Sequence, residues 1–151
     1  ILNRFVTEMT DVVFDHEGTL DKFLGDALLA VFGAPLDHPD HALKAVRAAL
    51  AMRKALSEMN RRPGATPLEM RIAINSGPAV TGDIGSPRRR EFTVLGDTVN
   101  TAARIESEVA QPGQIVISGA TFARLGGQIP ASPLEARTLR GRSSAIDLYC
   151  L

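Results

Sequence analysis

The chain has 151 residues, of which 44% are hydrophobic and 23% charged, ordinary values for one globular domain with its own core. Its formal net charge is +0, from 17 basic and 17 acidic residues, which argues against a nucleic-acid partner. The single cysteine, Cys150, excludes an internal disulfide and favours a reducing, cytoplasmic location. No apolar run reaches the roughly 18 residues that a membrane-spanning helix needs, so no membrane segment is predicted in this chain.

The N-terminal part of the chain predicts a helix, a hairpin and a second helix. Apolar residues at helical spacing indicate an amphipathic helix over residues 1 to about 16. Two strands follow, Thr19–Leu24 and Ala27–Phe32, and the Gly25-Asp26 pair between them predicts a hairpin with a carboxylate at its tip. The next helix is expected to carry one apolar stripe and to end before Arg62.

The C-terminal part of the chain predicts mainly strands. Strands over Leu68–Asn75 and Ala79–Ile84 precede an arginine-rich turn, Gly85–Arg90. The later elements are expected at Ile115–Ile117, Ala120–Leu125 (a short helix), near Leu134, and at Ala145–Leu151. Alternating helices and strands with inserted hairpins indicate an α+β or α/β domain with a mixed sheet. Residues 1–151 are therefore expected to form a single domain.

The stretch Arg90–Arg104 combines a strand, a tight turn and the start of a helix. Asp97 or Thr98 is expected to cap this helix by accepting a hydrogen bond from a free backbone N–H. Asn100 and Arg104 are four residues apart and therefore share one helix face. An amide and a guanidinium near a helix N-terminus suit an anionic ligand.

Three stretches, taken in order, resemble the class III nucleotidyl cyclases, the adenylyl and guanylyl cyclase catalytic domains. They are Gly18–Ala27, Asn75–Gly77 with Val80–Gly82, and Phe92–Arg104. The resemblance implies an α+β, ferredoxin-like domain with a mixed, mainly antiparallel sheet and helices packed on it. It also implies conversion of ATP to 3′,5′-cyclic AMP and pyrophosphate, with Mg²⁺ or Mn²⁺, by a homodimer with shared active sites.

The resemblance assigns the first three site residues. Asp26 matches a metal-binding aspartate of the family. A carboxylate suits this role, because hard divalent cations prefer carboxylate oxygens near phosphates. Lys22 and Thr93 match the two positions that select the purine: an ammonium can donate to adenine N1, and a hydroxyl can accept from the adenine amino group. Guanylyl cyclases typically place Glu and Cys there, so this pair favours ATP. The structural alternatives are a turn aspartate, a solvated lysine and an ordinary strand threonine.

The resemblance also assigns the residues that contact ribose and phosphate. Asn100 and Arg104 match the pair that holds these groups and stabilises the pentavalent transition state. Arg140 matches a basic residue that reaches the triphosphate, and its neighbour Arg142 is the alternative for that role. By spacing alone, Asn100 and Arg104 could equally be a solvated helix face. Asp97 is expected to be structural.

One part of the family pattern has no match in this sequence. The family's first metal aspartate lies on an N-terminal strand, and the Phe-x-Asp-Ile-x-Gly-Phe type of motif does not occur here. The expectation is therefore a partial chain, inactive alone, from a parent cyclase with regulatory domains and, in some cases, a membrane anchor. The alternatives are a guanylyl or relaxed-specificity cyclase, and an inactive cyclase-like module for dimerisation or nucleotide sensing.

Overall fold

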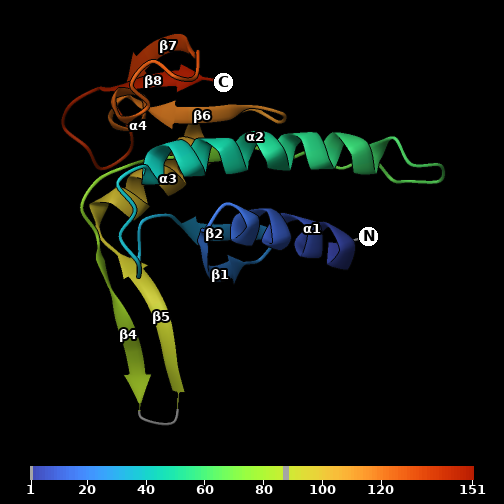
Figure 1. Ribbon diagram of the computed structural model, residues 1–151. Helices are drawn as coiled ribbons and strands as arrows, with labels where there is room; N and C mark the ends of the chain where they lie inside the picture. Colours follow the sequence, from blue (N-terminus) through green and yellow to red (C-terminus); the bar gives the residue numbers. More distant parts are fainter. Residues whose placement is uncertain (1, 87–88) are drawn as a thin grey trace.

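The computed structural model describes residues 2–86 and 89–151 (Figure 1). Its helices are α1 (Leu2–Asp15), α2 (His41–Asn60), α3 (Asp97–Glu108) and α4 (Gly119–Arg124). Its strands are β1 (Thr19–Leu24), β2 (Ala27–Val31), β3 (Ile72–Ile74), β4 (Val80–Ser86), β5 (Arg89–Leu95), β6 (Ile115–Ser118), β7 (Ser132–Arg137) and β8 (Ile146–Cys150). None of the helices in these ranges is both long enough and apolar enough to cross a lipid bilayer.

The described strands form three sheets. The largest has the order β3-β6-β8-β7; β3 and β6 are parallel, and the other neighbours are antiparallel. The hairpins β1-β2 and β4-β5 each form a separate two-stranded sheet, and β4-β5 extends away from the rest of the molecule (Figure 1). A mixed, mainly antiparallel sheet with helices packed on it is therefore confirmed. The strands do not form one continuous sheet, however: the hairpins β1-β2 and β4-β5 are separate from the four-stranded sheet.

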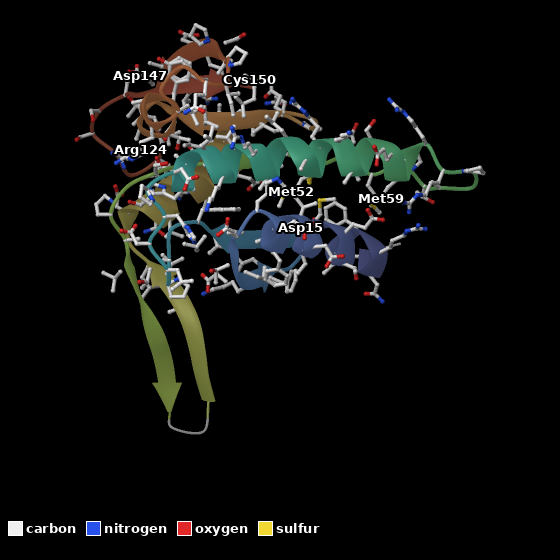
Figure 2. The ribbon with its side chains drawn as sticks, in the orientation of Figure 1. Asp15, Met52, Met59, Arg124, Asp147 and Cys150 are labelled. Carbon is white, nitrogen blue, oxygen red and sulfur yellow. The ribbon has the colours of Figure 1, made fainter. Side chains whose placement is uncertain are left out.

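Helix α2 lies between the four-stranded sheet and the unit formed by α1 and β1-β2 (Figure 1). On one side, its Leu43 and Val46 pack against Ile115 and Ile117 of β6. On the other side, Met52 and Met59 extend toward α1 (Figure 2), where they join a core cluster that contains Met9 of α1. The single apolar stripe expected for this helix is therefore too narrow, because α2 is covered from two directions.

Helix α3 packs on the face of the sheet opposite α2. Its Ile105, together with Val109 directly after the helix, is buried against Val116 of β6 and Leu148 of β8. Successive side chains of a strand point to opposite faces, so β6 directs Ile115 and Ile117 to α2 but Val116 to α3. This core fixes α3, and with it the helix face that carries Asn100 and Arg104.

Two predicted segments differ from the structure. The sequence predicts a turn over Gly85–Arg90, but β4 and β5 remain paired to Ser86 and Arg89, and the hairpin is longer. Arg88, in the middle of that expected turn, lies outside the described residues. The strand expected over Leu68–Asn75 is confined to Ile72–Ile74, since the side chain of Asn60 bonds both the N–H and the carbonyl of Leu68 in place of a neighbouring strand.

Candidate active site

The strands β1 and β5 bring Lys22 and Thr93 together. Lys22 Nζ donates a hydrogen bond to Thr93 Oγ1 at 3.2 Å. Thr93 is buried, with 8% of its surface exposed, whereas Lys22 is exposed. The register of β1 on β2 shifts between Leu20 and Lys22, as in a β-bulge, which re-aims side chains locally. The two residues thus present a cation and a hydroxyl side by side.

The start of α3 is held by tertiary contacts of its side chains. Gly96, with a φ of 132°, occupies the N-cap position, and no side chain caps the helix. Asp97 Oδ2 accepts from Arg142 Nη1 at 2.8 Å, and Thr98 Oγ1 donates to the Pro78 carbonyl at 2.5 Å. The expectation that Asp97 or Thr98 caps α3 is therefore wrong, because both side chains bond to distant loops.

The stretch Asn75–Gly77 has a structural role beneath α3. Asn75 Nδ2 donates to the Thr98 carbonyl at 3.0 Å, and Asn75 Oδ1 accepts from Ser118 Oγ at 2.7 Å. A Cβ at Gly77 would lie 2.8 Å from Thr98 Oγ1, so only glycine fits there without a shift. These contacts join the ends of β3 and β6 to the first turn of α3.

Asn100 and Arg104 lie on α3 as the spacing predicted. Asn100 is exposed, and its backbone N–H donates to the Gly96 carbonyl at 3.1 Å. Arg104 is partly buried, and its Nη1 donates to the backbone carbonyl of Arg140. A guanidinium has five N–H donors, so this bond leaves others free for a ligand.

The segment 139–142, called here the 139–142 turn, runs along α3. Its own closing bond joins the Arg142 N–H to the Leu139 carbonyl at 3.0 Å. The Arg140 N–H donates to Glu108 Oε1 at 3.3 Å, and the Arg140 side chain is exposed. Arg142 Nη1, in contrast, bonds both Asp97 Oδ2 and Thr101 Oγ1. Of the two arginines, the geometry favours Arg140 for contact with a ligand.

Asp26 is exposed at the turn between β1 and β2, as expected. Within residues 2–86 and 89–151, no group of three or more His, Cys, Asp or Glu residues is placed to hold a metal ion. Magnesium is commonly bound by one or two carboxylates together with substrate phosphates. Asp26 therefore fits the role of one metal ligand, but it does not form a complete metal site with its described neighbours.

Sequence reasoning missed the contacts that attach the 139–142 turn to α3. Asp97 and Thr101 are four residues apart, so their shared helix face was a usable signal for a common partner. Gly141 was the other signal, because a glycine between two arginines indicates a tight turn, and the structure gives it a φ of 80°. A Cβ on Gly141 would lie 2.5 Å from Arg104 Nη1, so the glycine gives that guanidinium its space.

Replacing Gly141 by alanine is expected to displace Arg104. The positive φ of 80° alone should cost about 1 kcal/mol of folding free energy. Gly127→Ala is the matched control, since Gly127 has a φ of 75° and no heavy atom lies within 4 Å of the position that its Cβ would take. We expect similar thermal midpoints for both variants and a loss of the cyclase activity that the resemblance implies only for Gly141→Ala. Equal turnover in the two variants would contradict this interpretation.

Comparison with known proteins identifies relatives along the whole chain. The family model for the adenylate and guanylate cyclase catalytic domain matches residues 1–151. Adenylate cyclase 1 of Rhizobium meliloti (strain 1021) is 35% identical over 153 residues, which cover 99% of this chain and 23% of that protein. The chain spans about a quarter or less of the length of the curated relatives it matches.

Solved structures agree on the fold. The crystal structure of the guanylyl cyclase Cya2 has a TM-score of 0.89 and 35% identity, covering 99% of this chain and 77% of that one. The catalytic core of a rhodopsin-guanylyl cyclase with converted specificity, in complex with ATPαS, has a TM-score of 0.88 and 32% identity, covering 99% and 79%. The chain therefore belongs to the family of adenylate and guanylate cyclase catalytic domains.

Proposed function

We propose that this chain is the catalytic domain of an adenylate cyclase, which converts ATP to 3′,5′-cyclic AMP and pyrophosphate in signal transduction inside the cell. The observation that carries the proposal is the Lys22–Thr93 pair, with Nζ and Oγ1 3.2 Å apart. An ammonium can donate to adenine N1, where guanine carries a hydrogen, and the hydroxyl can accept from the adenine amino group. The relative at 35% identity is named an adenylate cyclase.

The reaction is a displacement at the α-phosphorus. The ribose 3′-oxygen forms a bond to that phosphorus, the bond to the bridging oxygen breaks, and pyrophosphate leaves with the electron pair. The proton of the 3′-hydroxyl passes to water. Arg104 stabilises the negative charge that develops on the phosphoryl oxygens, Asn100 orients the ribose, and Arg140 binds the triphosphate. A Mg²⁺ or Mn²⁺ ion with Asp26 as one ligand would offset phosphate charge when bound.

A homodimer with composite sites completes the proposal. Val80 and Leu95 are paired across β4-β5 and are 70% and 50% exposed, so they form an apolar contact area at the base of the hairpin. Phe23 and Leu24, next to the turn that carries Asp26, are also exposed. A second copy that covers these residues would bring its Asp26 toward the substrate held by Lys22 and Thr93. We place this dimer in the cytoplasm.

A guanylyl or relaxed-specificity cyclase is the second candidate, because guanylyl cyclase structures also match this chain. The variant Lys22→Glu with Thr93→Cys is expected to move the ratio of kcat/KM for ATP over GTP by about 10²-fold or more toward GTP. The single substitutions should lower ATP turnover without comparable gain on GTP. An unchanged ratio in the double variant would exclude these two residues as the purine selectors.

Product analysis of the full-length protein tests the proposal directly. We expect cyclic AMP and pyrophosphate in equal amounts from ATP with Mg²⁺ or Mn²⁺. Cyclic GMP as the main product from an equimolar nucleotide mixture would favour the second candidate. Nucleotide binding without any cyclic product would identify a module that only dimerises or senses nucleotide.

A further inference from the structure

Arg142 bridges two side chains of α3 from outside the helix. Its Nη1 donates to Asp97 Oδ2 at 2.8 Å and to Thr101 Oγ1 at 2.9 Å. Asp97 and Thr101 lie one helical turn apart, so a single guanidinium spans the first turn of α3. The Arg142 side chain is 29% exposed and Asp97 is 78% exposed. Neither the purine-selecting pair nor the proposed phosphate contacts account for this bridge.

The bridge connects the parts of the molecule that carry the proposed ribose and phosphate contacts. Asn100 lies on the helical turn that Arg142 spans, between Asp97 and Thr101. Arg140 precedes Arg142 by two residues in the 139–142 turn, and the Arg140 carbonyl accepts a hydrogen bond from Arg104. The 139–142 turn is thus attached near the N-terminus of α3 through Arg142 and near the C-terminus of α3 through Glu108.

We propose that Arg142 is a positioning residue of this site. By bridging Asp97 and Thr101, it keeps the 139–142 turn in one register along α3, so that the Arg140 side chain approaches the same triphosphate as Arg104. The inference rests on the proposed function. It assigns Arg142 a role through Arg140 and not at the substrate, because the two N–H groups of its Nη1 are both directed to side chains of α3.

A role in positioning is distinguishable from a role in folding. The ion pair to the exposed carboxylate of Asp97 contributes little to stability and the hydrogen bond to buried Thr101 about 1 kcal/mol, so Arg142→Ala should change the thermal midpoint by no more than about 4 °C. Small displacements of groups around reacting atoms, in contrast, lower rates steeply. We expect Arg142→Ala to lower kcat/KM for ATP by about 10- to 100-fold in the full-length protein.

A double-mutant cycle with Arg140 tests the mechanism. If Arg142 acts by placing Arg140, adding Arg142→Ala to an Arg140→Ala protein should cost less than about 3-fold further. Losses that multiply instead would show that Arg142 works independently of Arg140, and would overturn the proposal. Arg142→Lys retains the charge without the fork of donors and should recover only part of the activity. Full activity of Arg142→Ala would equally overturn the proposal.

Arg137→Ala is the matched control. Arg137 also donates to α3, but to the Glu108 backbone carbonyl at 3.0 Å and from an exposed position on β7. It should leave kcat/KM within about 2-fold of the unchanged protein, since this solvated contact is made to the Glu108 backbone and not to the Oε1 atom that accepts from the Arg140 N–H. If Arg142→Ala unfolds, the cycle is run with Arg142→Lys in its place.

The double-mutant cycle of Arg140→Ala and Arg142→Ala, repeated with nucleotide affinity as the measured quantity, separates this inference from the proposed function. The probe is 3′-deoxy-ATP, which lacks the attacking hydroxyl, with its affinity measured by calorimetry. A protein that binds the probe but forms no cyclic AMP would contradict the proposed function, and the binding cycle would then decide the role of Arg142. A protein that binds no 3′-deoxy-ATP would overturn both.

Discussion

Arg104→Ala in the full-length protein is expected to lower kcat for cyclic AMP formation by about 10²- to 10³-fold, with a much smaller change in KM. The reason is that a fixed guanidinium contributes most where negative charge develops in the transition state, and removing one such donor typically has an effect of this size. Steady-state kinetics with ATP measures both constants. The alanine also removes the bond to the Arg140 carbonyl, so some loss of triphosphate affinity is expected.

Arg124→Ala is the control for that substitution. Arg124 is an exposed helical arginine at the end of α4 whose Nη1 bonds only the local Ala120 carbonyl, at 3.0 Å, among the described residues (Figure 2). It should leave kcat unchanged. Equal kcat values for Arg104→Ala and Arg124→Ala would remove Arg104 from the proposed mechanism, whatever the effect on KM.

Mixing two inactive variants is expected to restore activity to about a quarter of the unmutated level. Lys22→Ala removes the proposed purine contact, and Asp26→Ala removes the proposed metal ligand. In a symmetric dimer with composite sites, half of the randomly paired dimers hold one chain of each kind, and each of these has one intact site of two. Cyclic AMP production is measured as a function of the mixing ratio and should be maximal at equal amounts.

The matched control for mixing combines Lys22→Ala with Arg104→Ala. In the proposed dimer both residues belong to the same half of a site, so every mixed dimer has two damaged sites and no rescue should occur. No rescue by the first mixture would mean that each chain carries a complete site, and rescue by the second would mean that Lys22 and Arg104 of one chain serve different sites. The two mixtures use the same Lys22→Ala protein, so differences in expression or dimer affinity largely cancel.

The sequence anticipated local structure better than long-range contacts. The hairpin β1-β2 and the helix α3 follow from short-range signals: Gly25-Asp26 at a turn, and Asn100 and Arg104 at helical spacing. The use of Asp97 could not be inferred in this way. Capping is the ordinary role of an aspartate at the start of a helix, and its actual partner, Arg142, lies 45 residues further along the chain.

In the candidate site, too, local features could be predicted from the sequence and long-range contacts could not. The family resemblance selected Lys22 and Thr93, and the structure brings them within hydrogen-bond distance although 71 residues separate them. The choice between Arg140 and Arg142 is open in the sequence alone, because both are arginines beside one glycine. The structure favours Arg140 through a property that no short-range pattern contains: Arg142 is already bonded to Asp97 and Thr101, whereas the Arg140 side chain is exposed.

The separation of the strands into three sheets has a consequence for how specificity can change. Lys22 lies on the sheet β1-β2 and Thr93 on the sheet β4-β5, whereas Asn100, Arg104 and Arg140 are held by α3 and the turn that packs on the four-stranded sheet. In the proposed site, the purine contacts therefore lie on the two hairpins, whereas the proposed contacts of Asn100, Arg104 and Arg140 with ribose and phosphate lie on α3 and the 139–142 turn; of the phosphate-directed groups, Asp26 is the one that shares a hairpin with Lys22. If Lys22 and Thr93 select the purine as proposed, substitutions at these two positions would change the nucleotide preference without altering α3 or the 139–142 turn, and the preference would be easily changed in evolution.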